Sequence, residues 1–380
     1  MTSIGGAEMV DWNLAVATAT RLVRPGPEVS KDEARAVVAE LRRHAKSSEE
    51  HVRSFTGMGT EDTHDTPVLV VDRAGWIRAN VAGFREILKP LLEKMQDKRG
   101  SGPGGAVLGA VGGKVTGVEL GMLLSFLASR VLGQYETFAP ATRALPAGAN
   151  GGGRLLLVAP NIVHVERELD VDPHDFRLWV CLHEETHRTQ FTAVPWLRDH
   201  LEGEIQSFLG ETEVDPMTVL ERIREAAQTF AGGRSEDEGG EEGGTAADGG
   251  RSIVELVQTP AQREILARLT AVMSLLEGHA DFVMDGVGPD VVPSVEEIRE
   301  KFRERRARGA SRLDQALRKL LGLDAKLRQY RDGERFVRAV VQEVGMDGFN
   351  RVWTSPNTLP TKAEIAKPAD WVARVHRKGD

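Results

Sequence analysis

The segment HEETH at 183–187 constrains this chain most, because its two histidines lie four residues apart. Four residues make about one turn of a helix, so both imidazoles would lie on one helix face. Phe176, Val180 and Phe191 repeat at the same spacing and fall on that face. The pattern therefore predicts a helix over 174–191 whose histidines point, with its apolar residues, toward the interior.

The residues before this helix predict how it begins and what precedes it. Asp172 can cap the helix through its carboxylate, and Pro173 suits the first turn. Upstream, "LLLVAP" (155–160) and "NIVHVERE" (161–168) are the clearest strand-like runs, and a shorter one lies at 67–72. We expect a small sheet before the histidine helix. His164 within the second run is read as an ordinary surface residue.

The rest of the chain is predicted to be helical. Aromatic residues make up only 5% of the sequence, so the core should be aliphatic. Near the N-terminus, Ser30 can cap a helix over 31–55, with Glu33 completing a capping box. The fold class expected is α-dominated α+β, helical with a small β-sheet before the histidine helix.

Two parts of the chain are distinguished by composition. Residues 1–150 form the predicted N-terminal helical part, and 151–380 form the part that carries the histidine motif. The stretch 231–252 is rich in Gly, Glu and Asp and has no apolar residue larger than Ala, which predicts a disordered loop. The loop interrupts the second part, and the two parts are expected to form one composite domain.

The charge distribution and the apolar runs disfavour nucleic acid, a membrane and a nucleotide phosphate as partners. The net charge is −8 and no basic stripe is interleaved with aromatics, which disfavours nucleic acid. The glycine-rich run 104–132 contains Lys114 and Glu119, so a buried helix packed through small residues is expected rather than a membrane span. Its Gly113-Lys114 pair fails the phosphate-loop pattern, because Val115 follows the lysine.

The single cysteine and the N-terminal residues indicate in which cellular compartment the protein is expected. Cys181 is the only cysteine, which rules out an intrachain disulfide and fits a reducing compartment. The first residues do not resemble a secretory signal. We predict a soluble cytoplasmic protein with Cys181 and Trp179 buried in its core.

The histidine spacing also has a chemical interpretation. Two imidazoles one turn apart on a helix can bind one tetrahedral metal ion, so His183 and His187 are candidate ligands. Glu184 follows the first histidine and is placed to take a proton from a water that the metal activates. The alternative is that the two histidines are simply buried and hydrogen-bonded.

A second motif, "SLLEGHADFVMD" (274–285), supplies carboxylates in another predicted helix. Glu277 and Asp281 are four residues apart and share a face. Glu277 is the candidate third ligand, and Asp281 would accept the outer ring N–H of a ligating histidine. His279 is the alternative ligand, but it lies about 200° around the helix from Glu277. Gly278 would let another backbone approach closely.

Together the two motifs resemble the gluzincin arrangement of zinc metallopeptidases, HExxH followed by ExxxD. The chain more specifically resembles the actinobacterial zincin-like family of zinc-dependent hydrolases, one branch of which is labelled as associated with coenzyme F420 biosynthesis. The resemblance covers "DWNLAVATATRLVRPGP", "HEETHRTQF", "EGHADFVMD" and "LRQYRDGERFV". It departs from better-known gluzincins in one respect, because Glu277 comes 90 positions after His187.

The resemblance implies a zinc-dependent metallopeptidase or amide hydrolase with one Zn²⁺ per chain and a peptide or protein substrate. Glu184 would be the general base, and Tyr330, between Arg328 and Arg331, the candidate group that stabilises the oxyanion. Two alternatives remain open. One is a non-catalytic scaffold or binding protein stabilised by zinc, and the other an accessory protein of F420 metabolism.

Overall fold

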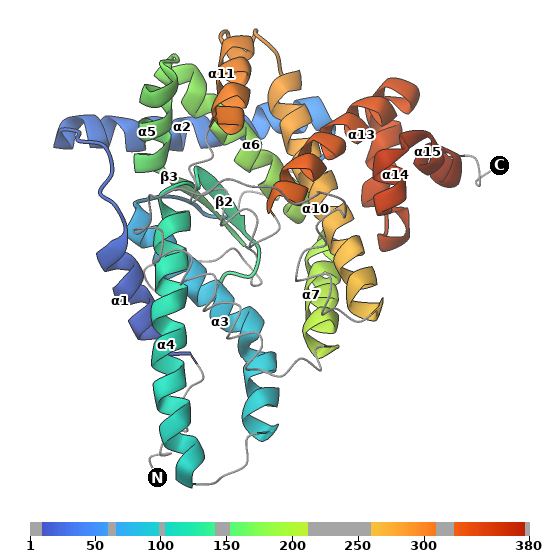
Figure 1. The fold of residues 1–380 in the computed structure, drawn as a ribbon. Helices are drawn as coiled ribbons and strands as arrows, with labels where there is room; N and C mark the ends of the chain where they lie inside the picture. Colours follow the sequence, from blue (N-terminus) through green and yellow to red (C-terminus); the bar gives the residue numbers. More distant parts are fainter. Residues whose placement is uncertain are drawn as a thin grey trace, which may run out of the picture.

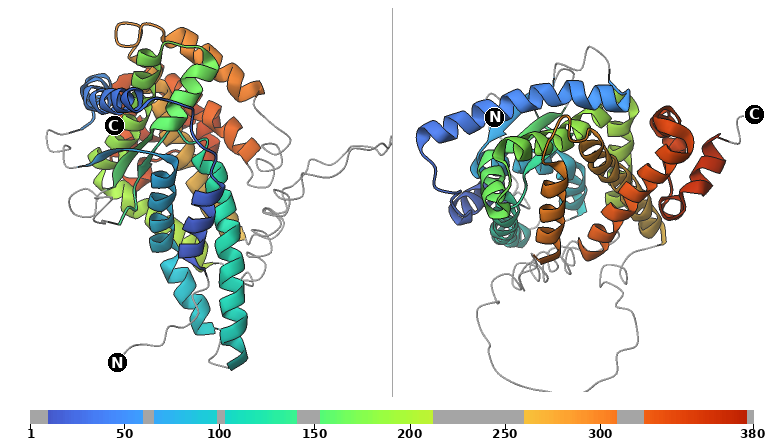
Figure 2. Two further views of the ribbon diagram at one scale, coloured as in Figure 1. Left: turned by 90° about the vertical axis from the view of Figure 1, so that its left-hand side faces the viewer. Right: turned by 90° about the horizontal axis from the view of Figure 1, so that it is seen from above.

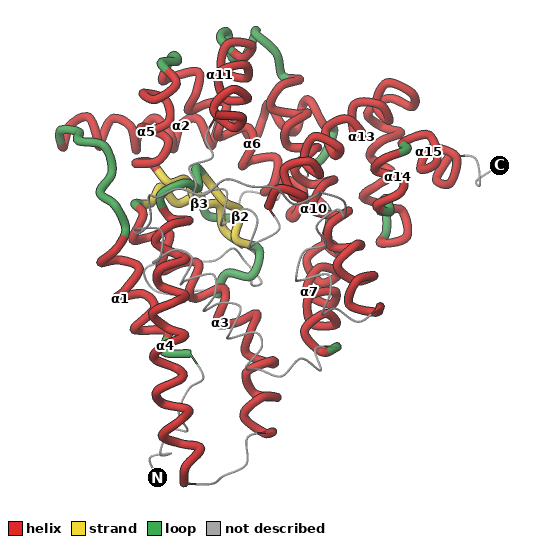
Figure 3. Tube along the Cα trace, viewed as in Figure 1, coloured by secondary structure: helices red, strands yellow, loops and turns green. Residues whose placement is uncertain are grey.

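Helices dominate the structure and surround a small central sheet (Figures 1 and 3). The computed structural model describes residues 10–59, 66–98, 103–140, 153–211, 260–308 and 323–376. The predicted α-dominated α+β class is confirmed. The predicted loop at 231–252 lies outside the described residues, and the division of the chain at residue 150 stays a prediction.

The sheet has three strands in the order β1-β3-β2. Strand β3 (Arg154–Val158) is central and completely buried, and it pairs in parallel with β1 (Val68–Val71). Strand β2 (Gly133–Glu136) runs antiparallel along its other side, with Gly133 opposite Leu157. β2 is therefore an edge strand of this sheet, and its first residue lies beside the end of β3.

Alternation along the strands gives the sheet two apolar faces, each covered by a layer of helices. Leu157 and its β1 neighbour Val70 belong to the core on one face, whereas Leu156 and Val158 belong to the core on the other. The first face packs on α2 (Lys31–Thr56), α5 (Ala159–Leu169) and α6 (Pro173–Ala193). The second packs on α1 (Trp12–Leu22), α3 (Arg73–Lys98) and α4 (Pro103–Ala128).

The strand predicted at 161–168 is wrong, because these residues form helix α5. β3 ends at Val158, and Pro160 occupies the first turn of the helix that follows. Proline lacks the N–H that a strand ladder needs, but its fixed φ angle suits the first turn of a helix. The β-branched residues of α5 are buried by helical packing. His164 lies on its surface, as predicted, with about half of its side chain exposed.

Two predicted helix caps can be compared with the structure. Asp172 accepts a hydrogen bond from the backbone N–H of Asp175 at 2.9 Å, which confirms the predicted start of α6. Ser30 likewise caps α2 by accepting from the backbone N–H of Glu33 at 3.1 Å. The second hydrogen bond of the predicted capping box, from the backbone N–H of Ser30 to the Glu33 carboxylate, is not formed. That carboxylate accepts instead from Arg167 of α5, at 2.6 Å.

The C-terminal helices lie to one side of the sheet, as the view from above in Figure 2 shows, and they form a separate apolar core. Helix α10 packs against both α6 and α13. A Cβ on Gly278 of α10 would overlap the backbone of Gly333 of α13, so the predicted close backbone approach is confirmed. The helices that form this core are α7 (Pro195–Gly210), α10 (Pro260–Gly286), α13 (Leu323–Phe349), α14 (Lys362–Ala366) and α15 (Pro368–His376). Helix α11 (Val295–Arg308) packs instead on α5 and α6 and contributes to the core beside the sheet.

The glycine-rich run forms helix α4, which packs on α1 through small residues as predicted. A Cβ on Gly117 would lie 2.6 Å from the carbonyl oxygen of Asp11, and one on Gly121 would lie 2.8 Å from that of Ala15. Among the described residues, we find no helix with the length and apolar character needed to cross a membrane.

Candidate metal centre

Helices α6 and α10 bring three of the predicted residues together. Nε2 of His183 lies 3.2 Å from Nε2 of His187. Oε2 of Glu277 lies 3.8 Å from Nε2 of His183, and Oε1 of Glu277 lies 3.7 Å from Nε2 of His187. Ligands bound to a tetrahedral zinc ion at ordinary bond lengths are roughly 3.3–3.5 Å apart. The spacing of the three donors therefore fits one such ion.

Buried Gln190 determines which nitrogen of His187 carries the proton. Its Nε2 donates to the carbonyl oxygen of Leu276 at 2.9 Å, and that oxygen can only accept. Gln190 Oε1 must then be the atom that lies 3.0 Å from Nδ1 of His187, so Nδ1 is the donor. Nε2 is consequently the nitrogen that faces His183 and Glu277 and can act as a metal ligand.

The predicted outer residue Asp281 lies beside the other histidine. Its Oδ1 is 3.6 Å from Nδ1 of His183, on the far side of the ring from Glu277. A carboxylate in this place favours a proton on Nδ1 and leaves Nε2 as the donor atom. Both histidines are thus arranged with Nε2 toward a common point. Two ring nitrogens and a carboxylate oxygen that converge in this way need a proton or a metal cation among them.

Glu184 lies next to these donors and is buried against the edge strand. Its side chain packs on the Cα of Gly133 so closely that a Cβ there would be 2.5 Å from Glu184 Cγ. Burial, and then the negative charge of Glu277, raises the pKa of Glu184 well above its usual value. The absence of a side chain at the first residue of β2 therefore makes room for this carboxyl group.

Comparison with known proteins assigns a family to this arrangement. The sequence model of the family described as zincin-like metallopeptidase matches residues 10–372. The chain belongs to the zincin-like metallopeptidase family. A crystal structure of a candidate hydrolase with a novel fold from Chloroflexus aurantiacus is similar to it, with a TM-score of 0.67 and 31% sequence identity. That similarity covers 97% of this chain and 100% of the other. The search of curated proteins found no match.

Both comparisons support a hydrolase of the metallopeptidase type, and the family implies zinc binding. The actinobacterial branch and the F420 label remain predictions, as does the cytoplasmic location.

His279, the predicted alternative ligand of this zincin-like chain, is not one of the three residues whose donor atoms converge. It is fully buried, and its Nδ1 accepts from Gln190 Nε2 at 3.1 Å. Burial, and then the nearby His187, lowers the pKa of His279 to about 3, so the ring is neutral. Its ring packs against Phe349 and Trp353. Among the described residues, the group of potential ligands at this place is His183, His187 and Glu277.

The opposite face of α6 is anchored by a buried ion-pair network that the sequence reasoning missed. Arg188 donates through Nε to Glu185 at 2.9 Å and pairs through Nη2 with Glu49 of α2, also at 2.9 Å. Burial raises the pKa of Glu185 to about 7 despite the opposing effect of Arg188. The i, i+3 spacing of Glu185 and Arg188 was the available signal, but it is equally typical of an exposed pair.

The other predicted residues have mixed outcomes. Cys181 and Trp179 are buried in the core as predicted, and burial raises the pKa of the Cys181 thiol well above its usual value. Tyr330 is part of helix α13, but the position of its side chain is not among those that the structure describes. Tyr135 of the edge strand β2 stacks on Phe191 of α6, with ring centroids 5.3 Å apart.

Proposed function

We propose that this chain is a zinc-dependent peptide or amide hydrolase. In this proposal His183, His187 and Glu277 hold one zinc ion, Asp281 and Gln190 orient the two imidazoles, and Glu184 is the general base. Tyr330 remains the candidate for oxyanion stabilisation. Membership of the zincin-like metallopeptidase family supports the reaction class.

The observation that carries the proposal is the convergence of three donor atoms from two helices. The ligand atoms of His183, His187 and Glu277 all lie within 4.8 Å of one another. Their side chains are 13–26% exposed, so the three residues are only partly buried. Three protein ligands are typical of catalytic zinc sites, whereas structural sites are usually closed by four protein ligands.

The donor set fits zinc in chemistry as well as in spacing. Two imidazoles and one carboxylate are ligands that zinc commonly takes, and both imidazoles present Nε2. When bound, zinc supplies a Lewis acid that polarises a carbonyl group and lowers the pKa of water.

Side chains of this protein carry out the proton transfers of the proposed hydrolysis. The Glu184 carboxylate accepts the proton of the attacking water and later returns it to the leaving nitrogen. Contact with Gly133 limits where that carboxylate can move. The Gln190 and Asp281 contacts maintain the imidazole orientations throughout.

The test is Glu184→Gln, compared with wild type on a mixture of peptides analysed by mass spectrometry. We expect cleavage to fall by about 10²–10⁴-fold because the amide cannot accept the proton. Zinc content should be unchanged, since Glu184 is not a ligand. The matched control, Glu202→Gln, changes an exposed carboxylate of α7 and should retain full activity. Cleavage by the Glu184 variant at the wild-type rate would refute the assigned base.

The same experiment separates the alternatives. A non-catalytic, zinc-stabilised binding protein would retain zinc in both proteins and cleave nothing in either. An accessory protein of F420 metabolism would likewise cleave no peptide, and a bound deazaflavin would be detected by its absorbance near the visible range.

A further inference from the structure

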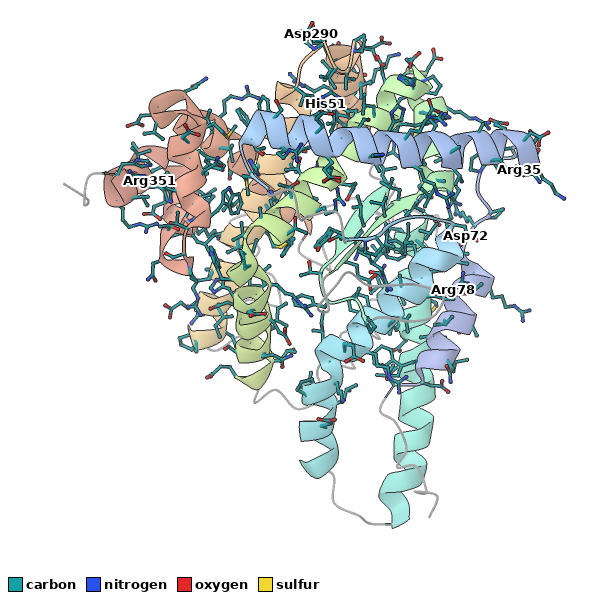
Figure 4. The ribbon with its side chains drawn as sticks, turned by 180° about the vertical axis from the view of Figure 1, so that it is seen from behind. Arg35, His51, Asp72, Arg78, Asp290 and Arg351 are labelled. Atoms are coloured by element: carbon teal, nitrogen blue, oxygen red, sulfur yellow. The ribbon has the colours of Figure 1, made fainter. Side chains whose placement is uncertain are left out.

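A second group of potential metal ligands lies on the other side of α6 from the family's HEETH motif, near the start of the helix. Glu40 and His44 come from consecutive turns of α2, and His174 comes from the first turn of α6. One donor atom from each of the three lies within 4.8 Å of the others. Figure 4 shows α2 crossing the back of the molecule, with Arg35 and His51 labelled toward its two ends.

The His44 side chain is the observation that points to a ligand. It is only 8% exposed, and its Nε2 is buried without a hydrogen-bond partner. That atom lies 3.5 Å from Glu40 Oε1, and the ring meets the His174 ring edge-on at a centroid distance of 4.5 Å. Because a buried polar atom without a partner costs free energy, its orientation toward a carboxylate and a second imidazole needs an explanation.

Glu40 is held so that one oxygen remains directed at the histidines. Arg177 of α6 donates to Oε2, whereas Oε1 is 2.8 Å from His174 Nδ1 and faces His44. Arg177 also donates through Nε to buried Glu166 at 2.9 Å. Two carboxylates therefore share one guanidinium, and the cluster carries one negative charge that is not balanced within it.

The donor types of the cluster suit a transition-metal cation. Burial lowers the pKa of His44, so its imidazole is neutral near neutral pH. Burial raises the pKa of Glu40, but hydrogen bonds with His174 and Arg177 outweigh that effect and leave the pKa below its usual value. The cluster thus offers two imidazoles and a carboxylate as ligands.

We propose that Glu40, His44 and His174 form a second metal site that binds a divalent transition-metal ion such as Zn²⁺. The ion replaces the hydrogen bond between Glu40 and His174. The His174 side chain is 63% exposed, so it can adjust to the ion and leave a coordination position for water. The site joins α2 to the beginning of α6, so an ion bound there would stabilise the folded chain. It is independent of the proposed active site and raises the zinc content to two ions per chain.

The test is zinc stoichiometry of the full chain, stripped with a chelator, reloaded with Zn²⁺ alone and analysed after dialysis. We expect two ions in wild type and one in His174→Ala, which should fold because the side chain is largely exposed. His164→Ala removes an exposed histidine of α5 that also has a carboxylate one turn away, at 3.8 Å, and should retain two ions. The melting temperature of each zinc-free variant checks folding.

His183→Ala distinguishes this proposal from the proposed active site. This variant should keep one ion and gain thermal stability when zinc is added, whereas the double variant His174→Ala/His183→Ala should bind none and show no gain. If His174→Ala binds as much zinc as wild type, the second site is refuted. If His183→Ala binds as much zinc as wild type while His174→Ala loses one ion, the second site stands and the proposed active site fails.

Discussion

At the scale of single residues, the contact between Gly133 and Glu184 sets the position of the proposed base. Gly133→Ala would place a Cβ 2.5 Å from Glu184 Cγ, so the carboxyl group or the edge strand must shift. A displacement near 1 Å at a reacting group can cost about 10²-fold in rate. We expect kcat to fall at least tenfold with zinc content unchanged, as measured by steady-state kinetics and elemental analysis.

Gly203→Ala is the matched control for this substitution. Gly203 lies in α7, and nothing is within 4 Å of the position that its Cβ would take. Alanine there should stabilise the helix by about 0.5–1 kcal/mol and leave kcat unaltered. Wild-type kcat in Gly133→Ala would show that the contact does not determine the position of Glu184.

At the scale of elements, the crossing of α10 and α13 determines where Glu277 lies. Gly278 is adjacent to Glu277, and a Cβ there would overlap the backbone of α13 at Gly333. Overpacking in a well-packed interior typically costs about 1–3 kcal/mol, and here backbone atoms would have to move. We expect Gly278→Ala to lower the free energy of unfolding by at least this amount and to weaken zinc binding, measured by urea unfolding and zinc titration. Unchanged values for both would contradict the close crossing.

The C-terminal helices supply a prediction about pH. Burial raises the pKa of Glu364 in α14, but hydrogen bonds from Arg374 and the backbone N–H of Thr361 outweigh it, so its pKa lies below the usual 4.5. The unfolded chain therefore binds the proton more readily, and the stabilisation is complete above pH 4.5 and lost as pH falls through the folded-state value. Glu364→Gln should cost about 1–3 kcal/mol at pH 7.

The loss caused by Glu364→Gln should diminish at acid pH, because wild type also loses the charged contact there. Urea unfolding at pH 7 and pH 3 measures both values. Glu343→Gln, at an exposed position of α13, serves as the control and should change neither. An equal loss at both pH values would show that the Glu364 charge contributes nothing.

At the scale of the whole molecule, the proposed active site links two apolar cores. His183 and His187 lie on α6, which contributes to the core beside the sheet, whereas α10 contributes residues to that core and to the C-terminal one. Zinc that binds the folded chain alone stabilises it by about 2.7 kcal/mol at a free concentration of 100 Kd. Chelation should therefore lower Tm.

This measurement is made on His174→Ala, so that only the proposed active site contributes. Its Tm by calorimetry should fall by a few degrees on chelation, and the fall should be absent in His174→Ala/His183→Ala. Equal responses in the two proteins would show that the metal does not act through His183.

Local features of the sequence determined where the histidine helix α6 begins and which residues share a face of α6 and of α10. Asp172 and Pro173 predict where α6 begins, and the i, i+4 spacing alone places His183 beside His187 and Glu277 on the same face as Asp281. Such relations extend over one helical turn, so they follow from backbone geometry whatever surrounds the helix.

Contacts between elements were decided by the tertiary structure. Gln190 reaches Leu276 and His279, Gly133 makes room for Glu184, and His44 meets His174 only because α10, β2 and α2 pack around α6. Residue periodicity specifies which face of a helix is buried but not which distant residue lies against it. The same limit explains the strand wrongly predicted at 161–168, because short apolar runs do not distinguish a buried strand from a buried helix.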